Sequence, residues 1–291
     1  MRKIDLHMHT TISDGTDRLE ELIPKVQAAG IELFSVSDHD AIRPGSLMPV
    51  LLEGVEHAPA FVRGVEFSCK DELGKYHVLG YGYDPDAPAI NAAVEHGNSL
   101  RREKTRARLD FLKEEFGFEF PPEEIRQLLQ RDNPGKPHIA ELMIRHGYAK
   151  EIKQAITEYI DKKKFRSMHI RPEEAIRSIL QSGGIPVLAH PSYGDGDDLI
   201  LGQDMEERLH YLMGFGLAGV EAYYSGFTAR IQMEILGLAD KYDLYITAGS
   251  DYHGRNKLVE LGDTNLKDIA DAPPGLHRFL EDVEILGGQK N

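Results

Sequence analysis

Residues 3–9 read Lys3-Ile4-Asp5-Leu6-His7-Met8-His9, a short run that is typical of a strand and that ends in two histidines. Six more strand-like runs follow, at residues 33–37, 61–65, 76–81, 186–189, 219–223 and 244–248. Helical patterns separate several of them; Thr16, for example, could cap a helix whose apolar face contains Leu19, Leu22, Ile23 and Val26. Strands that alternate with helices predict an α/β fold built on a parallel sheet or barrel.

Residues 88–170 interrupt this alternation. They are rich in charged residues and helix formers, contain no convincing strand pattern, and are punctuated by Pro121-Pro122 and by Pro134 and Pro137. We therefore predict a helical insertion between the fourth and fifth strands. On this interpretation residues 1–87 and 171–291 form the barrel, and residues 88–170 form an inserted helical domain that caps the substrate.

Nine potential metal ligands lie at or near the ends of the strand-like runs. They are His7, His9, Asp14, His39, Glu66, His77, His190, Asp251 and His253. In a parallel barrel the functional side chains project from the C-terminal ends of the strands, so residues that are distant in sequence would face one mouth. His77 fits less well, because it lies inside the fourth run. Imidazole and carboxylate groups bind divalent cations, and this set is large enough for two or three ions. The pattern indicates a metal-dependent hydrolase.

Each of these residues also has an ordinary interpretation when it is taken alone. Asp14 lies in a Ser-Asp-Gly-Thr sequence that would form a turn or a helix cap. Glu66 follows an apolar run, and a buried carboxylate requires a partner, which would be a metal or a buried arginine. Asp38 and Asp40 flank His39, and either could accept a hydrogen bond from its ring and fix the ring's orientation.

The composition narrows the class of protein. The formal net charge of -14 argues against a general nucleic-acid binder, which usually carries a basic excess. Cys69 is the single cysteine, so an internal disulfide is excluded and a reducing compartment is favoured. The sequence has no apolar run of about 18 residues that could span a membrane, and its first residues do not resemble a signal peptide. We expect a soluble cytoplasmic protein without membrane association, and no protein partner is implied.

Two segments of the insertion could bind an anionic substrate. Residues 100–108 contain five cations, and one face of a helix would carry Arg101, Lys104, Thr105 and Arg108. Residues 133–138 could present a cation, backbone N–H groups and an imidazole. The alternatives are a solvated helix whose cations pair with neighbouring acids, and a simple helix start. The predicted substrate-binding residues, which favour a small nucleotide with a second phosphate, are Arg101, Arg102, Lys104, Thr105, Asn133, Gly135, Lys136 and His138.

The motifs taken together resemble the PHP (polymerase and histidinol phosphatase) family. They are Asp5-Leu6-His7-Met8-His9, Ser13-Asp14-Gly15, Ser37-Asp38-His39-Asp40, Gly64-Val65-Glu66, His77, Ala189-His190-Pro191 and Ser250-Asp251-Tyr252-His253. The resemblance covers both ends of the chain. It implies a distorted seven-stranded (β/α) barrel, similar to a TIM barrel, with a trinuclear site that acts on phosphoesters. The implied cofactor is Mn²⁺ in two or three copies, with Fe²⁺ or Zn²⁺ as alternatives.

The resemblance also implies how the ligands are divided among three ions. The first ion would be held by His7, His9, Glu66 and Asp251, the second by the bridging Glu66 with His77 and His190, and the third by Asp14, His39 and His253. The helical insertion further resembles the members of the family that act on nucleoside 3′,5′-bisphosphates.

The implied reaction is hydrolysis of the 3′-phosphate of a nucleoside 3′,5′-bisphosphate, such as adenosine 3′,5′-bisphosphate, to the 5′-monophosphate and inorganic phosphate. A metal-bridging hydroxide would attack phosphorus in line with the leaving group. Asp14, Asp38 and His253 are the candidate catalytic acids. Alternatives within the family are a 5′–3′ exonuclease of short RNA or DNA and a histidinol phosphate phosphatase. Two further alternatives are a metal-binding module without turnover, which the complete ligand set disfavours, and a deaminase or amidohydrolase, whose bridging lysine the fourth strand lacks.

Overall fold

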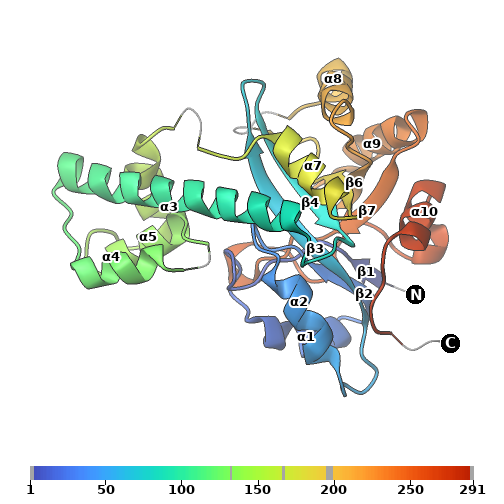
Figure 1. The fold of residues 1–291 in the computed structure, drawn as a ribbon, viewed down its shortest axis with the longest axis horizontal. Helices are drawn as coiled ribbons and strands as arrows, with labels where there is room; N and C mark the ends of the chain where they lie inside the picture. The colour runs from blue at the N-terminus through green and yellow to red at the C-terminus, as the bar shows by residue number, and fades with distance from the viewer. Residues whose placement is uncertain (1–2, 132, 166–167, 195–198, 289–291) are drawn as a thin grey trace.

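The computed structural model describes residues 3–131, 133–165, 168–194 and 199–288. Figure 1 shows an α/β part and a helical part that projects from it. The elements of the α/β part are β1 (Lys3–Asp5), α1 (Leu19–Ala28), β2 (Ile31–Val36), α2 (Arg43–Leu52), β3 (Ala60–Lys70), β4 (Lys75–Tyr81), α7 (Pro172–Gln181), β5 (Ile185–Leu188), α8 (Gly202–Met213), β6 (Gly219–Tyr224), α9 (Ala229–Lys241), β7 (Tyr245–Gly249), η3 (Gly254–Asn256), η4 (Ile269–Asp271) and α10 (Pro274–Asp282). Those of the projecting part are α3 (Pro88–Phe116), α4 (Pro122–Leu129), α5 (Lys136–Arg145), α6 (Ile152–Gln154), the π-helical turn η1 (Ala155–Tyr159) and the 3₁₀ turn η2 (Ile160–Lys162).

The strands form a seven-stranded, mostly parallel sheet in sequence order, from β1 to β7. Only β4 runs against its neighbours β3 and β5. Hydrogen bonds also join the chain after β1 to the chain at β7: the Leu6 N–H donates to the Ala248 carbonyl at 2.9 Å, and Met8 forms a parallel bridge with Tyr252. The first and last strands of the sheet therefore meet at one end.

The antiparallel strand differs from the regular alternation that the sequence predicted. Residues 71–74 join β3 to β4 without a helix, so the two strands form a hairpin instead of the crossover that parallel strands need. The second half of β3, from Gly64 to Lys70, pairs with β4. Glu66 therefore lies within a strand, and its predicted place at the end of a strand is wrong.

The predicted apolar face of the first helix is confirmed, but its predicted cap is wrong. Leu19, Leu22, Ile23 and Val26 of α1 are buried, and Arg18 occupies the N-cap position. The Thr16 hydroxyl instead accepts a hydrogen bond from the Arg255 N–H at 3.0 Å. Thr16 thus connects the loop after β1 to the loop after β7, two segments that carry potential ligands.

Two apolar cores support the sheet. The larger core includes Val65, Leu79, Val187 and Ile246 from the strands and packs against α7, α8, α9 and α10. The smaller one joins α1 and α2 to β2 and β3. Burial of each large apolar side chain contributes about 1.5–3 kcal/mol, so these cores hold the ends of the strands in place.

The projecting part has an apolar core of its own. Leu109 and Leu112 of α3 pack with Leu128 of α4 and with Ile139 and Met143 of α5. These helices occupy the region in which the sequence predicted an insertion, and α3 runs along the whole projecting part (Figure 1). Within the described ranges, no helix combines the length and the apolar character needed to cross a bilayer.

Candidate metal centre

The nine potential ligands come from the loops after β1, β2, β5 and β7 and from the strands β3 and β4. Three overlapping groups of them could hold a metal ion, because one ligand atom from each residue lies within 4.8 Å of the others in its group. The groups are His9, Asp14, His39 and His253; His7, His9 and Glu66; and His39, Glu66 and His77. The shared members join the groups into one cluster, which we call the ligand cluster.

Glu66 lies at the centre of the ligand cluster and is almost completely buried. Its Oε2 atom is 3.3 Å from His7 Nε2 and 3.2 Å from His9 Nε2. Its Oε1 atom is 2.9 Å from His77 Nδ1 and 3.2 Å from His190 Nε2. Its Oε2 atom also lies 3.0 Å from His39 Nδ1. The two oxygens of one carboxylate thus face different sets of imidazoles, which is an arrangement that allows a carboxylate to bridge two cations.

Asp251 faces two of the imidazoles that Glu66 Oε2 faces. Its Oδ1 atom is 3.6 Å from His7 Nε2 and 3.4 Å from His9 Nε2. Its Oδ2 atom accepts a hydrogen bond from the Tyr224 hydroxyl at 3.0 Å. The φ angle of Asp251 is +60°, a left-handed conformation that residues other than glycine rarely adopt. Such a backbone is typical of sites at which function determines the conformation.

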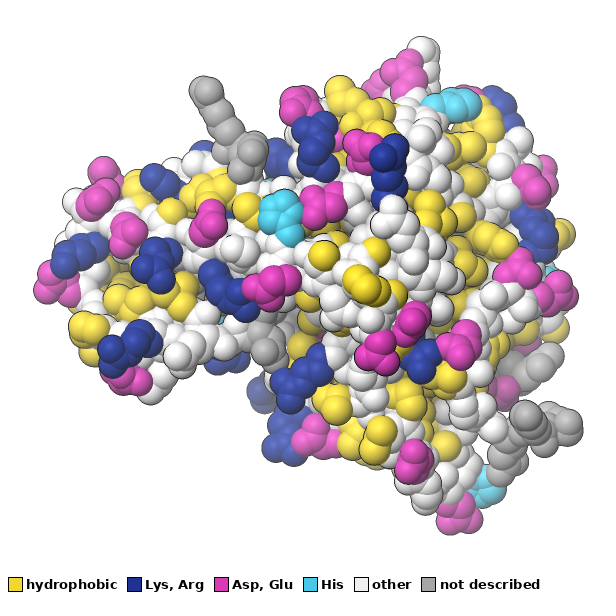
Figure 2. Space-filling model, viewed as in Figure 1, with side chains coloured by type: hydrophobic (Ala, Val, Ile, Leu, Met, Phe, Trp, Pro, Cys, Tyr) yellow, Lys and Arg dark blue, Asp and Glu magenta, His cyan; other side chains and the backbone are white. Residues whose placement is uncertain are grey.

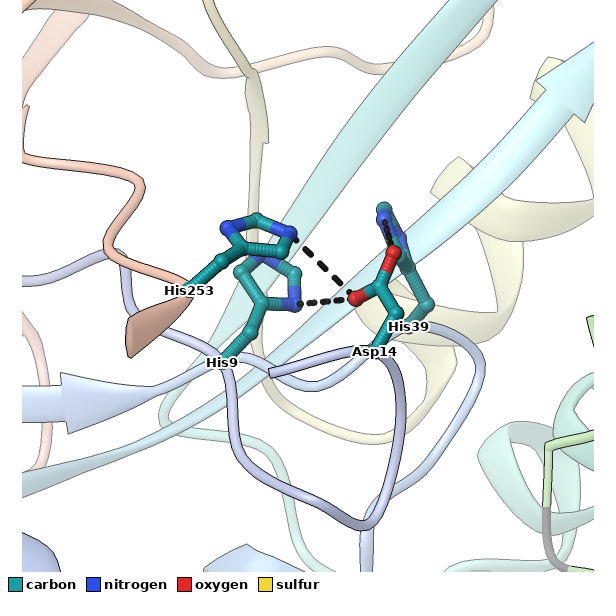
Figure 3. Close-up of side chains that lie close together, drawn as sticks. All are labelled: His9, Asp14, His39 and His253. Carbon is teal, nitrogen blue, oxygen red and sulfur yellow. Dashed lines mark ion pairs between the residues drawn. The ribbon is translucent and has the colours of Figure 1, made fainter. Parts of the chain in front are cut away.

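Asp14 faces three imidazoles at the other end of the ligand cluster (Figure 3). Its Oδ1 atom is 3.3 Å from His253 Nε2 and 3.8 Å from His9 Nδ1. Its Oδ2 atom is 3.8 Å from His39 Nε2. The Asp14 side chain is 34% exposed, whereas that of His9 is completely buried. A substrate can therefore approach the cluster from the side of Asp14.

Several buried ligand atoms have no hydrogen-bond partner in the part of the chain that the structure describes. They include Nε2 of His7, Nε2 of His9 and Oε2 of Glu66. An unpaired buried polar group destabilises a fold by about 1–3 kcal/mol. Because these three atoms face one another, a single cation between them would satisfy all three. The ligand cluster therefore fits divalent metal ions.

The carboxylates of the cluster are held in the charged form that binds metals. Burial disfavours ionisation of Glu66, but the imidazoles of His39 and His77 outweigh it and hold the pKa of this carboxyl well below its usual value. Burial also opposes ionisation of Asp251, but His7, His9 and Lys257 together outweigh it, so the pKa of Asp251 is likewise well below its usual value.

Asp38, which the sequence suggested as an acid, is completely buried beneath the loop that carries Asp14. Its oxygens accept hydrogen bonds from the Thr10 N–H at 2.7 Å, the Thr10 hydroxyl at 2.6 Å and the Ser13 hydroxyl at 2.5 Å. Both oxygens are engaged by this loop. The geometry therefore favours a role for Asp38 in positioning Asp14 over a role as a proton donor.

Glu221 is a residue of the site that the sequence analysis did not identify. It lies in β6 and is completely buried. Its Oε1 atom accepts a hydrogen bond from His7 Nδ1 at 2.9 Å, and its Oε2 atom accepts one from the His190 N–H at 2.8 Å. A carboxylate behind a histidine fixes the ring's tautomer and directs the other nitrogen towards a metal. The available signal was an acid in the middle of the apolar run 219–223.

Two adjoining cavities open beside the ligand cluster. The central cavity, of about 430 Å³, is bounded by Asp14, His39 and His77 of the cluster and by residues of the projecting part, which include Asn133, Gly135, Lys136 and His138. The basic cavity, of about 200 Å³, is bounded by the cations Lys75, Arg101, Lys104, Arg108 and Lys136. The two cavities share His77, Arg101 and Lys136, so the basic cavity opens directly from the central one.

Lys104 is the most deeply buried cation of the basic cavity, with 7% of its surface exposed. Its Nζ atom is 2.8 Å from Nε2 of His169. Burial, together with the neighbouring guanidinium groups of Arg101 and Arg108, lowers the pKa of Lys104 to about 6. An anion in the cavity would offset this repulsion and favour the charged form.

The structure does not place every predicted substrate residue at a cavity. Arg102 lies one residue beyond Arg101, and the helical rotation turns it outward, where it pairs with Glu95 at 3.2 Å. Thr105 is buried, and its hydroxyl donates to the Pro134 carbonyl at 3.2 Å. Neither geometry supports a substrate contact for Arg102 or Thr105.

Three relatives of known name match nearly the whole chain. The chain is 30% identical over 260 residues to the phosphoribosyl 1,2-cyclic phosphate 1,2-diphosphodiesterase of Eggerthella lenta. This match covers 86% of this chain and 94% of the relative. It is 28% identical over 298 residues to the 3′,5′-nucleoside bisphosphate phosphatase of Chromobacterium violaceum. This match covers 98% of this chain and 97% of the relative. It is 26% identical over 283 residues to the 5′-3′ exoribonuclease of Haemophilus influenzae. This match covers 96% of this chain and 99% of the relative.

Solved structures show the same fold. A protein from Bifidobacterium adolescentis described as a metal-dependent phosphoesterase aligns with a TM-score of 0.81 at 24% identity, over 97% of each chain. An amidohydrolase from C. violaceum aligns with a TM-score of 0.77 at 25% identity, over 96% of each chain. The chain matches no family model. Its relatives are nevertheless phosphoesterases, and the site is that of a metal-dependent phosphoesterase. The chain belongs to the PHP family, as its motifs indicated.

Proposed function

We propose that this enzyme hydrolyses the 3′-phosphate of nucleoside 3′,5′-bisphosphates and releases the 5′-monophosphate and inorganic phosphate. The observation that carries the proposal is the basic cavity, which opens from the central cavity beside the ligand cluster. With the 3′-phosphate at the cluster, the 5′-phosphate would occupy the basic cavity. The name of the C. violaceum relative supports this assignment.

We further propose that the ligand cluster holds two or three divalent ions, divided as the family resemblance implies. The distances from Glu66 to His7 and His77 and from Asp14 to His253 agree with this division, whereas His39 lies between Asp14 and Glu66 and could serve either end. Mixed imidazole and carboxylate ligands suit Mn²⁺, with Fe²⁺ or Zn²⁺ as alternatives. When bound, such ions lower the pKa of water and stabilise charge on phosphoryl oxygens. Asp14 and His253 lie at the open end of the cluster, where either could protonate the leaving O3′ atom.

The charge of the basic cavity suits a terminal phosphate, which carries nearly two negative charges. Of its cations, Arg101 donates to Asp40 at 2.6 Å, and Lys136 pairs with Asp161 at 2.6 Å. Lys104 faces a histidine instead of an acid, so it is available for an anion. Charge-assisted hydrogen bonds from such groups are among the strongest in proteins.

A second candidate substrate is a pentose that carries two phosphates but no base. No Phe, Tyr or Trp among the described residues borders the central or the basic cavity. Nucleobases are commonly bound by stacking on such side chains. The name of the E. lenta relative, which refers to a phosphoribosyl cyclic phosphate, agrees with this alternative.

We also infer that residues 1–87 and 171–291 form a distorted (β/α)7 barrel and that residues 88–170 form a domain that caps the substrate. The hydrogen bonds between the chain after β1 and β7 support closure of the barrel. Lys104 and Lys136 support the capping role, because these residues of the insertion border the cavities beside the ligand cluster.

Parallel kinetics would test the proposed function. We expect adenosine 3′,5′-bisphosphate to have a higher kcat/KM than phosphoribosyl 1,2-cyclic phosphate or histidinol phosphate. Lys104→Met should lower kcat/KM for the bisphosphate by about tenfold or more, since a charged hydrogen bond contributes about 1.5–3 kcal/mol. It should affect p-nitrophenyl phosphate, which lacks a second phosphate, much less.

Lys113→Met, on the exposed end of the same helix, is the matched control. A preference for the cyclic phosphate would favour the second candidate substrate. An equal loss for both phosphate esters in Lys104→Met would show that the basic cavity does not bind the second phosphate.

A further inference from the structure

We propose that Arg101 of α3 is a positioning residue, which acts through Ser68 to orient the imidazole of His39. The inserted helices would thereby hold one ligand of the metal centre in place. The inference rests on the proposed division of the ligand cluster, in which His39 binds an ion together with Asp14. It gives Arg101 a role other than the phosphate contact that the sequence predicted.

One edge of the Arg101 guanidinium group spans two acceptors. Its Nε atom donates to Asp40 Oδ2 at 2.6 Å, and its Nη2 atom donates to Ser68 Oγ at 2.7 Å. Asp40 is buried, and its Oδ1 atom accepts a hydrogen bond from the Ser68 N–H at 3.1 Å. Because a planar guanidinium fixes the direction of both of its hydrogen bonds, the ion pair of Arg101 and Asp40 holds Ser68 by its backbone and by its hydroxyl.

The Ser68 hydroxyl in turn contacts His39. Its Oγ atom lies 3.3 Å from His39 Nδ1, and because Arg101 donates to one lone pair of this oxygen, the other can accept a hydrogen bond from the ring. The ionised carboxylate of Glu66, whose Oε2 atom is 3.0 Å from the same nitrogen, can only accept. Both neighbours therefore favour the tautomer with its proton on Nδ1. The lone pair of Nε2 is then left on the side of Asp14, whose Oδ2 atom is 3.8 Å away.

The projecting part contacts the loop of His39 at two more points. Nδ2 of Asn98 donates to the Asp40 carbonyl at 3.3 Å, and Nδ2 of Asn133 donates to the His39 carbonyl; both asparagines are buried. A Cβ atom on Gly97 would lie 3.4 Å from Asp40 Cγ, so α3 approaches this loop closely. The central cavity lies between the two parts of the molecule, and the surface is indented where they join (Figure 2). A shift of these helices would therefore move the loop that carries His39.

Arg101 borders both cavities, so a direct contact with a substrate phosphate is the competing role. The two roles predict different losses. A phosphate ligand contributes to the affinity for the second phosphate of a bisphosphate and leaves metal binding unchanged. A positioning residue contributes to the affinity for one ion, and its loss lowers the hydrolysis of every phosphate ester to the same extent.

Two variants of the full-length protein test the inference. Ser68→Ala removes the hydroxyl and keeps the ion pair of Arg101 with Asp40. Arg101→Lys keeps a cation beside the buried carboxylate, but a lysine lacks the planar fork that also holds Ser68. Ser178→Ala is the matched control, because Ser178 is a buried serine of α7 whose hydroxyl donates to the Ala175 carbonyl at 2.8 Å. Calorimetric titration of the metal-free proteins with Mn²⁺ measures each ion's affinity. Kinetics with adenosine 3′,5′-bisphosphate and p-nitrophenyl phosphate measure the substrate preference.

We expect Ser68→Ala and Arg101→Lys to bind one ion about 10–100-fold more weakly and the other ions with wild-type affinity. At limiting Mn²⁺ the activity on both esters should fall by the same factor, and excess Mn²⁺ should restore it. Ser178→Ala should match the wild-type protein in every measurement.

Two results overturn the inference and leave the proposed function standing. One is wild-type affinity for every ion in either variant. The other is a loss in Arg101→Lys that is confined to the bisphosphate, which would make Arg101 a phosphate ligand. A wild-type protein that binds no Mn²⁺ overturns both this inference and the proposed division of the ligand cluster.

Discussion

Replacing Glu221 with glutamine would show whether the histidines of the ligand cluster form a metal centre or only happen to lie together. The substitution keeps the shape of the side chain but turns one acceptor oxygen into an NH₂ donor. The His190 N–H, 2.8 Å from the carboxylate, can only donate, so the amide oxygen must face it. The NH₂ group would then face His7 Nδ1 and require that atom to accept. His7 could accept only with its proton on Nε2, the atom that faces Glu66 and that would bind the metal.

The expected size of this effect follows from the position of Glu221 behind His7. Removing the partner of a metal-binding histidine typically lowers metal affinity about 10–100-fold, which corresponds to about 1.4–2.8 kcal/mol. Titration calorimetry with Mn²⁺ on the metal-free protein, with elemental analysis after dialysis, would measure the loss. We expect Glu221→Gln to bind one ion more weakly by this factor while its far-ultraviolet circular dichroism spectrum stays unchanged.

A surface pair of the same kind provides the control. Glu174 accepts a hydrogen bond from Nδ1 of His96 at 2.7 Å, away from the ligand cluster. Glu174→Gln should therefore leave metal affinity at the wild-type value. If Glu221→Gln binds every ion as tightly as the wild-type protein does, the proposed tautomer of His7 is wrong, and with it the assignment of His7 as a ligand.

Three further predictions concern the metal, the basic cavity and the packing around the site. Treatment with a chelator should lower Tm, because ions that bind only the folded state stabilise it, and added Mn²⁺ should restore it; a Tm that is insensitive to both would argue against bound ions. The pKa of Lys104 is about 6 in the free enzyme, and a bound phosphate should raise this pKa. Above about pH 6, substrate binding should therefore be accompanied by uptake of a proton, and the affinity should fall as the pH rises. Calorimetry in two buffers of different ionisation enthalpy should detect the proton uptake above this pH in the wild-type protein but not in Lys104→Met. Equal proton uptake in both proteins would mean that another group takes up the proton. A Cβ atom on Gly249 would lie 2.2 Å from His7 Cβ and 2.4 Å from Glu221 Oε1, so Gly249→Ala should lower the free energy of unfolding by about 1–3 kcal/mol; wild-type stability in urea denaturation would show that these neighbours can move.

The convergence of the potential ligands could be predicted from the sequence because it follows from the direction of the strands. His190 comes directly after a buried apolar run and Asp251 follows another by a few residues, and parallel strands bring their C-terminal ends to the same edge. The structure places both beside the ligand cluster: His190 Nε2 is 3.2 Å from Glu66 Oε1, and Asp251 Oδ1 is 3.4 Å from His9 Nε2. The apolar face of α1 was predictable for a similar reason, since its spacing alone indicates which side is buried.

The features that the sequence did not reveal depend on pairing and on helical phase. Glu66 was expected at the end of a strand because the pairing of β3 with β4 leaves no local signal. Glu221 resembled an ordinary strand residue, since its partners His7 and His190 are distant in the sequence. Arg102 was grouped with its neighbours in a run of cations, but a rotation of about 100° per residue turns it away from the cavities.

Elemental analysis of active enzyme, purified without added metal, tests directly whether the ligand cluster holds metal ions. We expect two or three transition-metal ions per chain, loss of phosphatase activity when a chelator removes them, and recovery when Mn²⁺ is returned. Active enzyme that contains no stoichiometric transition metal, or full activity after the ions have been removed, would contradict this account of the site.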